Sequence, residues 1–175
     1  MKTGHFIIIA IALLTLSSCE DKFKPASSDV IGKETPTHES WNSSVLFTDS
    51  SVTKAVLFAG HISVYTESAY TLIDSGAKVE FYKDEKIVST LTGKRGKIND
   101  KTKDIEIFDS VMVVSSDSIR LNTSRLYWNN TTRKVSTEEF VKIKTPNEEI
   151  EGYGFESDQS LSNYRIFRVS GTFTK

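Results

Sequence analysis

Residues 121–141 read LNTSRLYWNNTTRKVSTEEFV, and this stretch decides the fold. Apolar and polar residues alternate on both sides of a polar Asn-Asn-Thr-Thr segment, which places Leu126 and Trp128 on one face of a strand. The alternating run at residues 139–144 likewise places Val141 and Ile143 on one face of a strand. The stretch therefore predicts two antiparallel strands joined by a polar loop, each strand with one buried face and one face in water.

Residues 91–111 show the same arrangement about thirty residues earlier, with a polar loop at 99–104 that corresponds to 129–134. Residues 150–158 begin a third, degenerate copy. A repeat of this kind is typical of stacked hairpin-like units, none of which can bury its apolar face alone. Chance similarity among β-rich segments is the alternative explanation.

Short strands and polar turns continue from residue 41 to residue 173. Alternating runs occur at residues 61–65 and 78–81, and the nearest approach to a helix is a turn at residues 157–163. Turns between strands are predicted at residues 74–76, 99–101, 115–117, 128–130 and 145–147. Short strands at even spacing predict an all-β sandwich, jelly roll or barrel.

The N-terminal region predicts export and lipidation. Lys2 precedes an apolar run at residues 6–16, which is too short to span a bilayer and suits a signal peptide. Leu16-Ser17-Ser18-Cys19 resembles a lipobox, and Cys19 is the only cysteine of the chain, so disulfides are excluded. We expect a signal peptide at 1–18, a lipidated Cys19 with a flexible tether at 19–40, and one folded domain at 41–175.

The composition and motifs of the 175-residue chain disfavour several function classes. Its 22 Lys and Arg balance 23 Asp and Glu, so nucleic acid is not an expected partner. There is no G-x-S-x-G motif, and of the three histidines only His61 falls in the expected domain. Residues 99–104 lack the glycine and closing glutamate of a calcium loop and predict a polar turn. No catalytic residue, metal site or cofactor is therefore predicted.

The inward faces of the strands are the candidate binding surface. Their apolar side chains either fill a closed core or line an open groove for acyl chains, since each buried CH₂ contributes about 0.8 kcal/mol. The two glycines of Gly152-Tyr153-Gly154-Phe155 predict a bulge or a bend in the strand, or a place where another backbone or a ligand approaches it closely. The candidate groove residues are Ile62, Val64, Val79, Phe81, Val111, Val113, Leu126, Trp128, Val141, Ile143 and Phe155.

Taken in order, several segments resemble the LptC family of lipopolysaccharide (LPS) export proteins. The resemblance runs from about Val45 to Val169, and each segment is short, so their order and spacing carry it. The "L-x-T-x-x-L-x-W", "V-S-T" and "G-x-G-F-E" pieces echo the repeat shared by LptC, LptA and the N-terminal part of LptD. The segments are residues 45–49, 54–61, 121–128, 135–137 and 150–156.

This resemblance implies a twisted, open β-jelly roll that accepts LPS acyl chains in an apolar interior. It implies transfer of LPS from an LptBFG-type ABC transporter to an LptA-type bridge protein, without an enzymatic step. Strand addition would join the domain to its partners, through the strand at residues 165–173 on one side and the strand near Val45 on the other. It places the chain on the periplasmic side of the envelope.

One departure concerns the anchor. Better-known LptC proteins hold the membrane with a transmembrane helix, whereas this sequence offers a lipobox at Cys19. Attachment to the inner membrane is favoured, and attachment to the outer membrane is the alternative. Two other functions stay open: an envelope-assembly lipoprotein scaffold with a closed core that binds only proteins, and an enzyme whose site is assembled from scattered Ser, Asp and Tyr.

Overall fold

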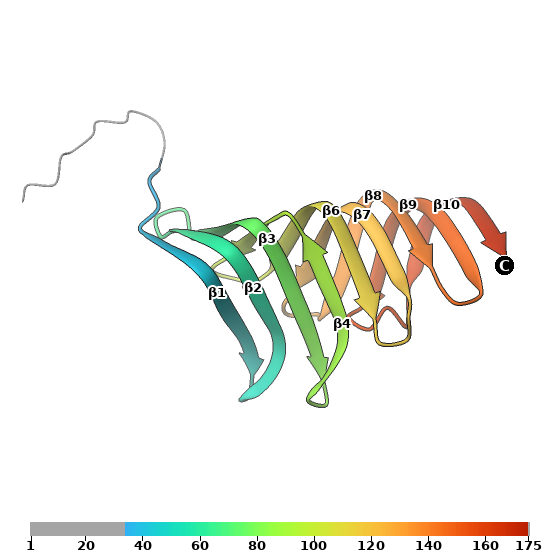
Figure 1. Cartoon of the computed structure of the whole chain (residues 1–175), viewed down its shortest axis with the longest axis horizontal. Coiled ribbons are helices and arrows are strands. Elements are labelled where there is room, and N and C mark those ends of the chain that lie inside the picture. Colours follow the sequence, from blue (N-terminus) through green and yellow to red (C-terminus); the bar gives the residue numbers. More distant parts are fainter. Residues whose placement is uncertain (1–33, 175) are drawn as a thin grey trace, which may run out of the picture. The chain divides into compact units, whose positions relative to one another are not determined.

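The computed structural model describes residues 34–174 as one antiparallel sheet of ten strands (Figure 1). Neighbours in the sheet follow chain order, except that β5 continues the line of β4 and pairs with the same two strands, β3 and β6. The strands are β1 (His38–Asp49), β2 (Val52–Tyr65), β3 (Tyr70–Lys83), β4 (Lys86–Gly93), β5 (Arg95–Asn99), β6 (Ile105–Ser115), β7 (Arg120–Asn129), β8 (Lys134–Lys144), β9 (Glu148–Asp158) and β10 (Arg165–Thr174).

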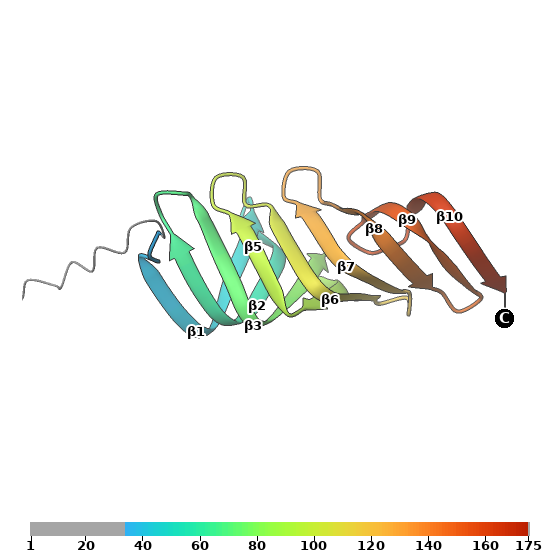
Figure 2. The ribbon, with the colours of Figure 1, turned by 90° about the horizontal axis from the view of Figure 1, so that it is seen from above.

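The sheet stays open at both ends. Within the described residues, β1 pairs only with β2 and β10 only with β9, so the sheet does not close into a barrel. The two edge strands lie at opposite ends of the sheet, as Figure 2 shows. The all-β open jelly roll expected from the sequence is confirmed.

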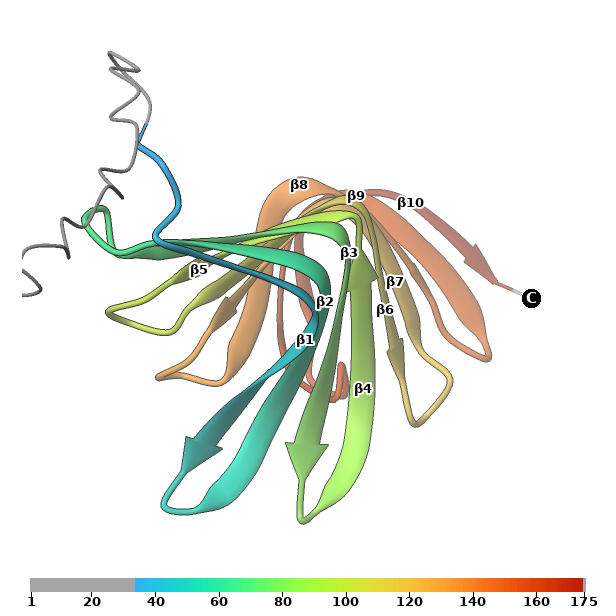
Figure 3. The same ribbon diagram turned by 60° about the vertical axis from the view of Figure 1, so that its left-hand side comes forward.

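The sheet is folded along one line, which we call the crease (Figure 3). Pairing registers shift there between Ala59 and His61, between Phe108 and Val111, and between Thr137 and Phe140. A bulged strand bends and twists, so bulges aligned across a sheet fold it. The two halves of the folded sheet face each other as two walls, and the apolar core lies between them. We call the space between the walls, most of which side chains fill, the trough.

The loops form two rows, one along each wall of the trough. Because the strands run antiparallel in chain order, alternate loops fall on opposite walls. The first row contains the loops at residues 66–69, 100–104, 130–133 and 159–164. The second row contains the loops at residues 50–51, 84–85, 116–119 and 145–147.

One predicted turn proves to be part of the crease. Residues 74–76 were expected between two strands, but they lie inside β3, where Ser75 has φ 60° and Gly76 has φ 99°. The prediction was wrong because Asp-Ser-Gly suits a bulge as well as a turn, and pairing with β2 continues on both sides of it. The other four predicted turns lie at strand ends, as expected.

The glycine-rich segment at residues 152–155 forms the crease in β9. Gly154 has φ 74°, a conformation that favours glycine. A Cβ atom on Gly152 would collide with the carbonyl oxygen of Arg168 on β10. The segment therefore provides both a bend and a close approach of two backbones.

The internal repeat is visible in two matching loops. Oδ1 of Asn99 accepts hydrogen bonds from the backbone N–H groups of residues 101 and 102, and Oδ1 of Asn129 accepts them from residues 131 and 132. Each loop closes with a residue at positive φ, Lys103 in one and Arg133 in the other. Two loops with the same hydrogen bonds and backbone shape favour a true repeat over chance similarity.

The first strand begins at His38, three residues before the expected start of the domain at residue 41. Residues 38–40 belong to β1 because they pair with residues 62–64 of β2. Residues 157–163 form the end of β9 and a turn rather than a helix, as expected. Among the residues described, no helix has the length and apolar character needed to cross a membrane.

Candidate functional site

The walls of the trough carry the residues expected to line a groove. Ten of the eleven have exposed fractions between 0 and 5%, and Val64 is half-buried against them. The alternation of apolar and polar residues therefore identified the inward face correctly. Whether these side chains contact a ligand stays a prediction, because in this conformation most of them contact one another.

Sequence reasoning missed part of the same interior. Ile105 and Ile107 lie on the inward face of β6, and the alternation of that strand would have revealed them. Leu161 is also fully buried, although it lies in a loop, where no alternation marks it. The other large aliphatic side chains that are fully buried in this core are Leu57, Ile73, Leu91 and Leu121.

A hollow of about 630 Å³ lies at the β1 end of the trough. Its lining includes two of the expected groove residues, Ile62 and Val64. Val45 and Phe47 of β1 lie opposite them in the lining, and Ile98 of β5 adds a further apolar surface. The rest of the lining is largely polar, with Ser40, Ser43, Ser44 and Thr48 of β1, Thr71 of β3, and Asp100, Lys103 and Asn130 of the first-row loops. A pocket that offers both apolar and polar surface suits an amphiphile.

An aromatic cluster lies beside the hollow. The indole of Trp128 on β7 contacts Phe47 edge-on, with ring centroids 5.5 Å apart. Phe81 of β3 lies at the same centroid distance from Trp128. Trp128 belongs to the first wall, and both phenylalanines belong to the second, so the cluster joins the walls beside the hollow, whose lining includes Phe47.

An ion pair crosses the trough beside this cluster. Nη2 of Arg133 in the first-row loop lies 3.4 Å from Oδ2 of Asp49, the last residue of β1. Nη1 of Arg133 donates to Oδ1 of Asn130 at 3.0 Å, and its guanidinium carbon lies 5.7 Å from the ring of Trp128. Arg133 therefore connects a first-row loop to the end of β1 on the opposite wall.

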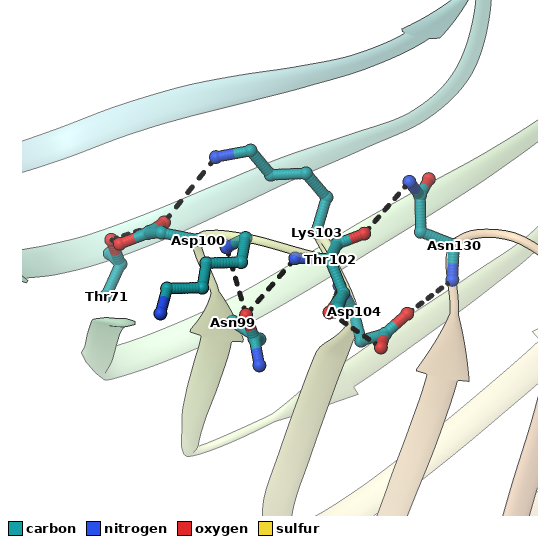
Figure 4. Close-up of polar contacts among 8 residues, drawn as sticks. Thr71, Asn99, Asp100, Thr102, Lys103, Asp104 and Asn130 are labelled. Atoms are coloured by element: carbon teal, nitrogen blue, oxygen red, sulfur yellow. Dashed lines mark hydrogen bonds and ion pairs between the residues drawn. The ribbon is translucent and has the colours of Figure 1, made fainter. Parts of the chain in front are cut away.

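The first-row loops are linked to one another by polar contacts (Figure 4). Oδ1 of Asp104 accepts a hydrogen bond from the backbone N–H of Asn130 at 2.8 Å, and Nδ2 of Asn130 donates to the carbonyl of Thr102. Thr71 donates to the carboxylate of Asp100, whose Oδ1 lies 3.8 Å from Nζ of Lys103. These bonds fix the rim of the hollow along β3, β5, β6 and β7.

The loop between β9 and β10 occupies the trough at the far end. Leu161 of this loop has φ 61°, and its side chain is buried in the interior. Ser89 of β4, on the opposite wall, donates a hydrogen bond to the carbonyl of Gln159. Burial opposes the charge of Asp158, but hydrogen bonds from Asn163 and Ser160 keep the pKa of this carboxyl below its ordinary value. The loop is therefore held in place by a charged, hydrogen-bonded carboxylate.

Both edge strands expose large apolar side chains. Trp41 and Leu46 are exposed on β1, and Phe167, Val169 and Phe173 are exposed on β10. An open strand edge with apolar side chains is a template for pairing with another chain.

Two further predictions concern sites. No group of three or more His, Cys, Asp or Glu residues within the described part of the chain could hold a metal ion. Cys19, the predicted site of lipid attachment, lies outside the described residues, as do the signal peptide and most of the tether.

Comparison with known proteins identifies the family. The profile of the family described as "Lipopolysaccharide-assembly, LptC-related" matches residues 6–171, which is nearly the whole chain. A search of curated proteins finds no significant match. The family implies involvement in LPS transport on the periplasmic side of the envelope, and it is a family of transport components rather than of known enzymes. The chain therefore belongs to the LptC-related family of lipopolysaccharide-assembly proteins.

Proposed function

We propose that this protein carries LPS across the periplasm by holding its acyl chains in the trough, without an enzymatic step. The observation that supports this most is the continuity of the apolar interior. Its side chains follow the inner face of the sheet from β1 to β9, and within the described residues the sheet does not close around them. Such a surface offers a path along which a lipid could move while its headgroup stays in water.

The hollow at the β1 end is the proposed point of entry. Here apolar side chains such as Val64 border space rather than packing only against one another. Further movement between the walls would require Phe47 and Trp128 to separate, since their rings are in contact across the trough.

The two edge strands are the proposed docking sites. We assign β1 to the side of an LptBFG-type transporter and β10 to an LptA-type bridge protein. Main-chain hydrogen bonds to the open edges would provide affinity, and exposed side chains such as Leu46 and Phe173 would provide specificity. We further propose that lipid on Cys19 anchors the protein, with the inner membrane as its favoured location.

Photocrosslinking to purified LPS tests acyl-chain binding. A photoreactive residue at Val64 in the hollow should crosslink to LPS, and one at Val141 in the packed interior should do so only if chains pass Trp128. A photoreactive residue at Ile87, which is exposed on β4, is the control. Equal crosslinking at Val64 and Ile87 would contradict a trough site.

The alternative is an envelope scaffold with a closed core that binds only proteins. The tight packing of residues such as Phe81, Val141 and Phe155 favours it, since these side chains have no exposed surface. Depletion of the protein in the cell separates the two functions. Accumulation of LPS in the inner membrane would support transport, while normal LPS export with defective assembly of other envelope proteins would support the scaffold.

A further inference from the structure

Arg133 has more hydrogen-bonding capacity than its neighbours use. A guanidinium carries five N–H groups, and within the described part of the chain it has two partners, Oδ1 of Asn130 and Oδ2 of Asp49. Asn130 is itself fixed, since its backbone N–H donates to Asp104 and its amide donates to Thr102. Arg133 is therefore held in one position with donors to spare.

Asp49 is a weak partner for this guanidinium. The contact joins one nitrogen to one oxygen at 3.4 Å, and the Asp49 side chain is 58% exposed against 28% for Arg133. A single exposed ion pair of this kind contributes little to stability, whereas a planar guanidinium binds a phosphate through two parallel hydrogen bonds. A phosphate ester could therefore displace the carboxylate at small cost.

A second donor beside Arg133 lacks a partner. Nε1 of Trp128 is buried and has no hydrogen-bond acceptor among the residues described, although the Trp128 side chain is only 1% exposed. The guanidinium carbon of Arg133 lies 5.7 Å from the ring of this tryptophan. A buried N–H without an acceptor is unfavourable, so an acceptor brought to this place would gain a bond that the empty protein does not make.

The hollow is lined by residues that contact the side chains of Arg133 and Trp128. Asn130, which holds Arg133, is part of its rim, and Phe47, which contacts Trp128, is part of its wall. Lys103 on the same rim adds positive charge, with Asp100 as its partner at 3.8 Å. Apolar space thus adjoins a cationic group with free donors, as recognition of a phosphorylated amphiphile requires.

We propose that Arg133, together with Nε1 of Trp128, is the receptor for a phosphate ester of LPS whose acyl chain occupies the hollow, and that Asp49 takes the place of this phosphate when the site is empty. Asn130 is a positioning residue that orients the guanidinium. The proposal rests on the proposed function and adds a headgroup subsite to it. Arrival of the phosphate releases Asp49 and so frees the end of β1 from the first-row loops.

The test compares two lipids on the full-length chain in mild detergent. The probe is a photoreactive residue at Val64, titrated with LPS that carries its lipid A phosphates and with the same LPS after phosphatase treatment. We expect Arg133→Ala to raise the half-saturating concentration of intact LPS about tenfold, equivalent to about 1.4 kcal/mol, and to leave that of dephosphorylated LPS unchanged.

Three variants complete the design. Arg133→Lys keeps the charge but loses the planar pair of donors, so it should fall between wild type and Arg133→Ala. Asp49→Asn removes the competing carboxylate and should lower the half-saturating concentration of intact LPS. Arg125→Ala is the matched control, because Arg125 pairs with Glu106 at 2.8 Å on the outer face of the sheet. Near-ultraviolet circular dichroism of each variant checks that it is folded.

The outcomes separate the subsite from the proposed function. Absence of crosslinking at Val64 with either lipid, in wild type, overturns both. Equal crosslinking of both lipids by wild type, unchanged in a folded Arg133→Lys, overturns the phosphate subsite and leaves acyl-chain binding intact. Inorganic phosphate is added as a competitor, to test whether the site binds free phosphate rather than a lipid headgroup. Competition only at millimolar concentration supports a lipid headgroup, and competition at micromolar concentration assigns the site to free phosphate and overturns the proposal.

Discussion

Nδ1 of His61 on β2 lies 3.1 Å from Oδ1 of Asp74 on β3, and this pair braces the crease beside the edge of the sheet. Nε2 of the same imidazole lies 3.2 Å from Oε1 of Glu39, and its ring stacks on Trp41 with centroids 4.8 Å apart. One histidine therefore links β1, β2 and β3. These contacts add to the backbone pairing of β1 with β2, which runs from His38 to Asp49.

The pair predicts a dependence of stability on pH. The hydrogen bond from His61, followed by that from Ser75, holds the pKa of Asp74 below its ordinary value of about 3.9. Charged Asp74 thus stabilises the fold at pH values above that value, and this contribution is lost as pH falls through the lowered pKa. Asp74→Asn should be less stable than wild type at neutral pH, and the difference should vanish in acid. Urea unfolding between pH 7 and pH 2 measures it.

Asp117→Asn provides the control for this titration, since Asp117 lies in an exposed turn between β6 and β7. A difference between wild type and Asp74→Asn that stays constant down to the most acidic pH would contradict the role assigned to the Asp74 charge.

Truncation of Leu161 tests the loop that fills the far end of the trough. Leu161 is fully buried, so Leu161→Ala should lower the free energy of unfolding by about 2–4 kcal/mol through lost burial and a cavity. Leu46→Ala, at an exposed position on β1, should change it by less than about 0.5 kcal/mol. Urea denaturation of both variants gives the comparison, and equal effects would mean that the loop does not pack as described.

Gly152→Ala tests the close approach of β9 and β10. Its Cβ atom would meet the carbonyl oxygen of Arg168, so the variant should lose about 1–3 kcal/mol and lower the hydrogen-exchange protection of β10. At Gly171 the added Cβ would meet only the Phe173 side chain, at 3.4 Å. Gly171→Ala should therefore be tolerated. Full protection of β10 amides in Gly152→Ala would disprove the close approach.

The two loops that follow Asn99 and Asn129 have the same hydrogen bonds, so equivalent substitutions in them should have similar effects on stability. Asn129→Ala and Asn99→Ala each remove the acceptor of two backbone N–H groups, and each should cost about 1–2 kcal/mol of unfolding free energy. Asn147→Ala, in an exposed second-row loop, is the control. Thermal unfolding of the three variants measures this, and a large effect at only one of the two loops would argue against their equivalence.

The sequence predicted what depends on local pattern. Alternation placed Val79 and Phe81 on an inward face because neighbouring side chains in a strand point to opposite sides. The polar segments after Asn99 and Asn129 were assigned to loops because Asn side chains cap such turns. The order of short segments also indicated the family that the profile match shows.

Features that depend on the folding of the whole sheet were beyond sequence reasoning. Phe47 and Trp128 meet only because the crease brings β1 opposite β7. The contact between Arg133 and Asp49 joins residues 84 positions apart and has no local signature. Leu161 is buried because its loop turns inward, which the composition of the loop does not reveal. The candidate hollow follows from these long-range contacts.

The crease also constrains how such a domain can be extended. The long strands such as β3, β6 and β8 cross the bend and contribute to both walls, while β4 and β5 share one line, with one strand on each wall. Another chain could add a strand at β10. If that strand bends in line with the crease, it extends the crease and both walls together and keeps them aligned. Extension of such a folded sheet therefore needs one matching bend rather than two separately matched walls.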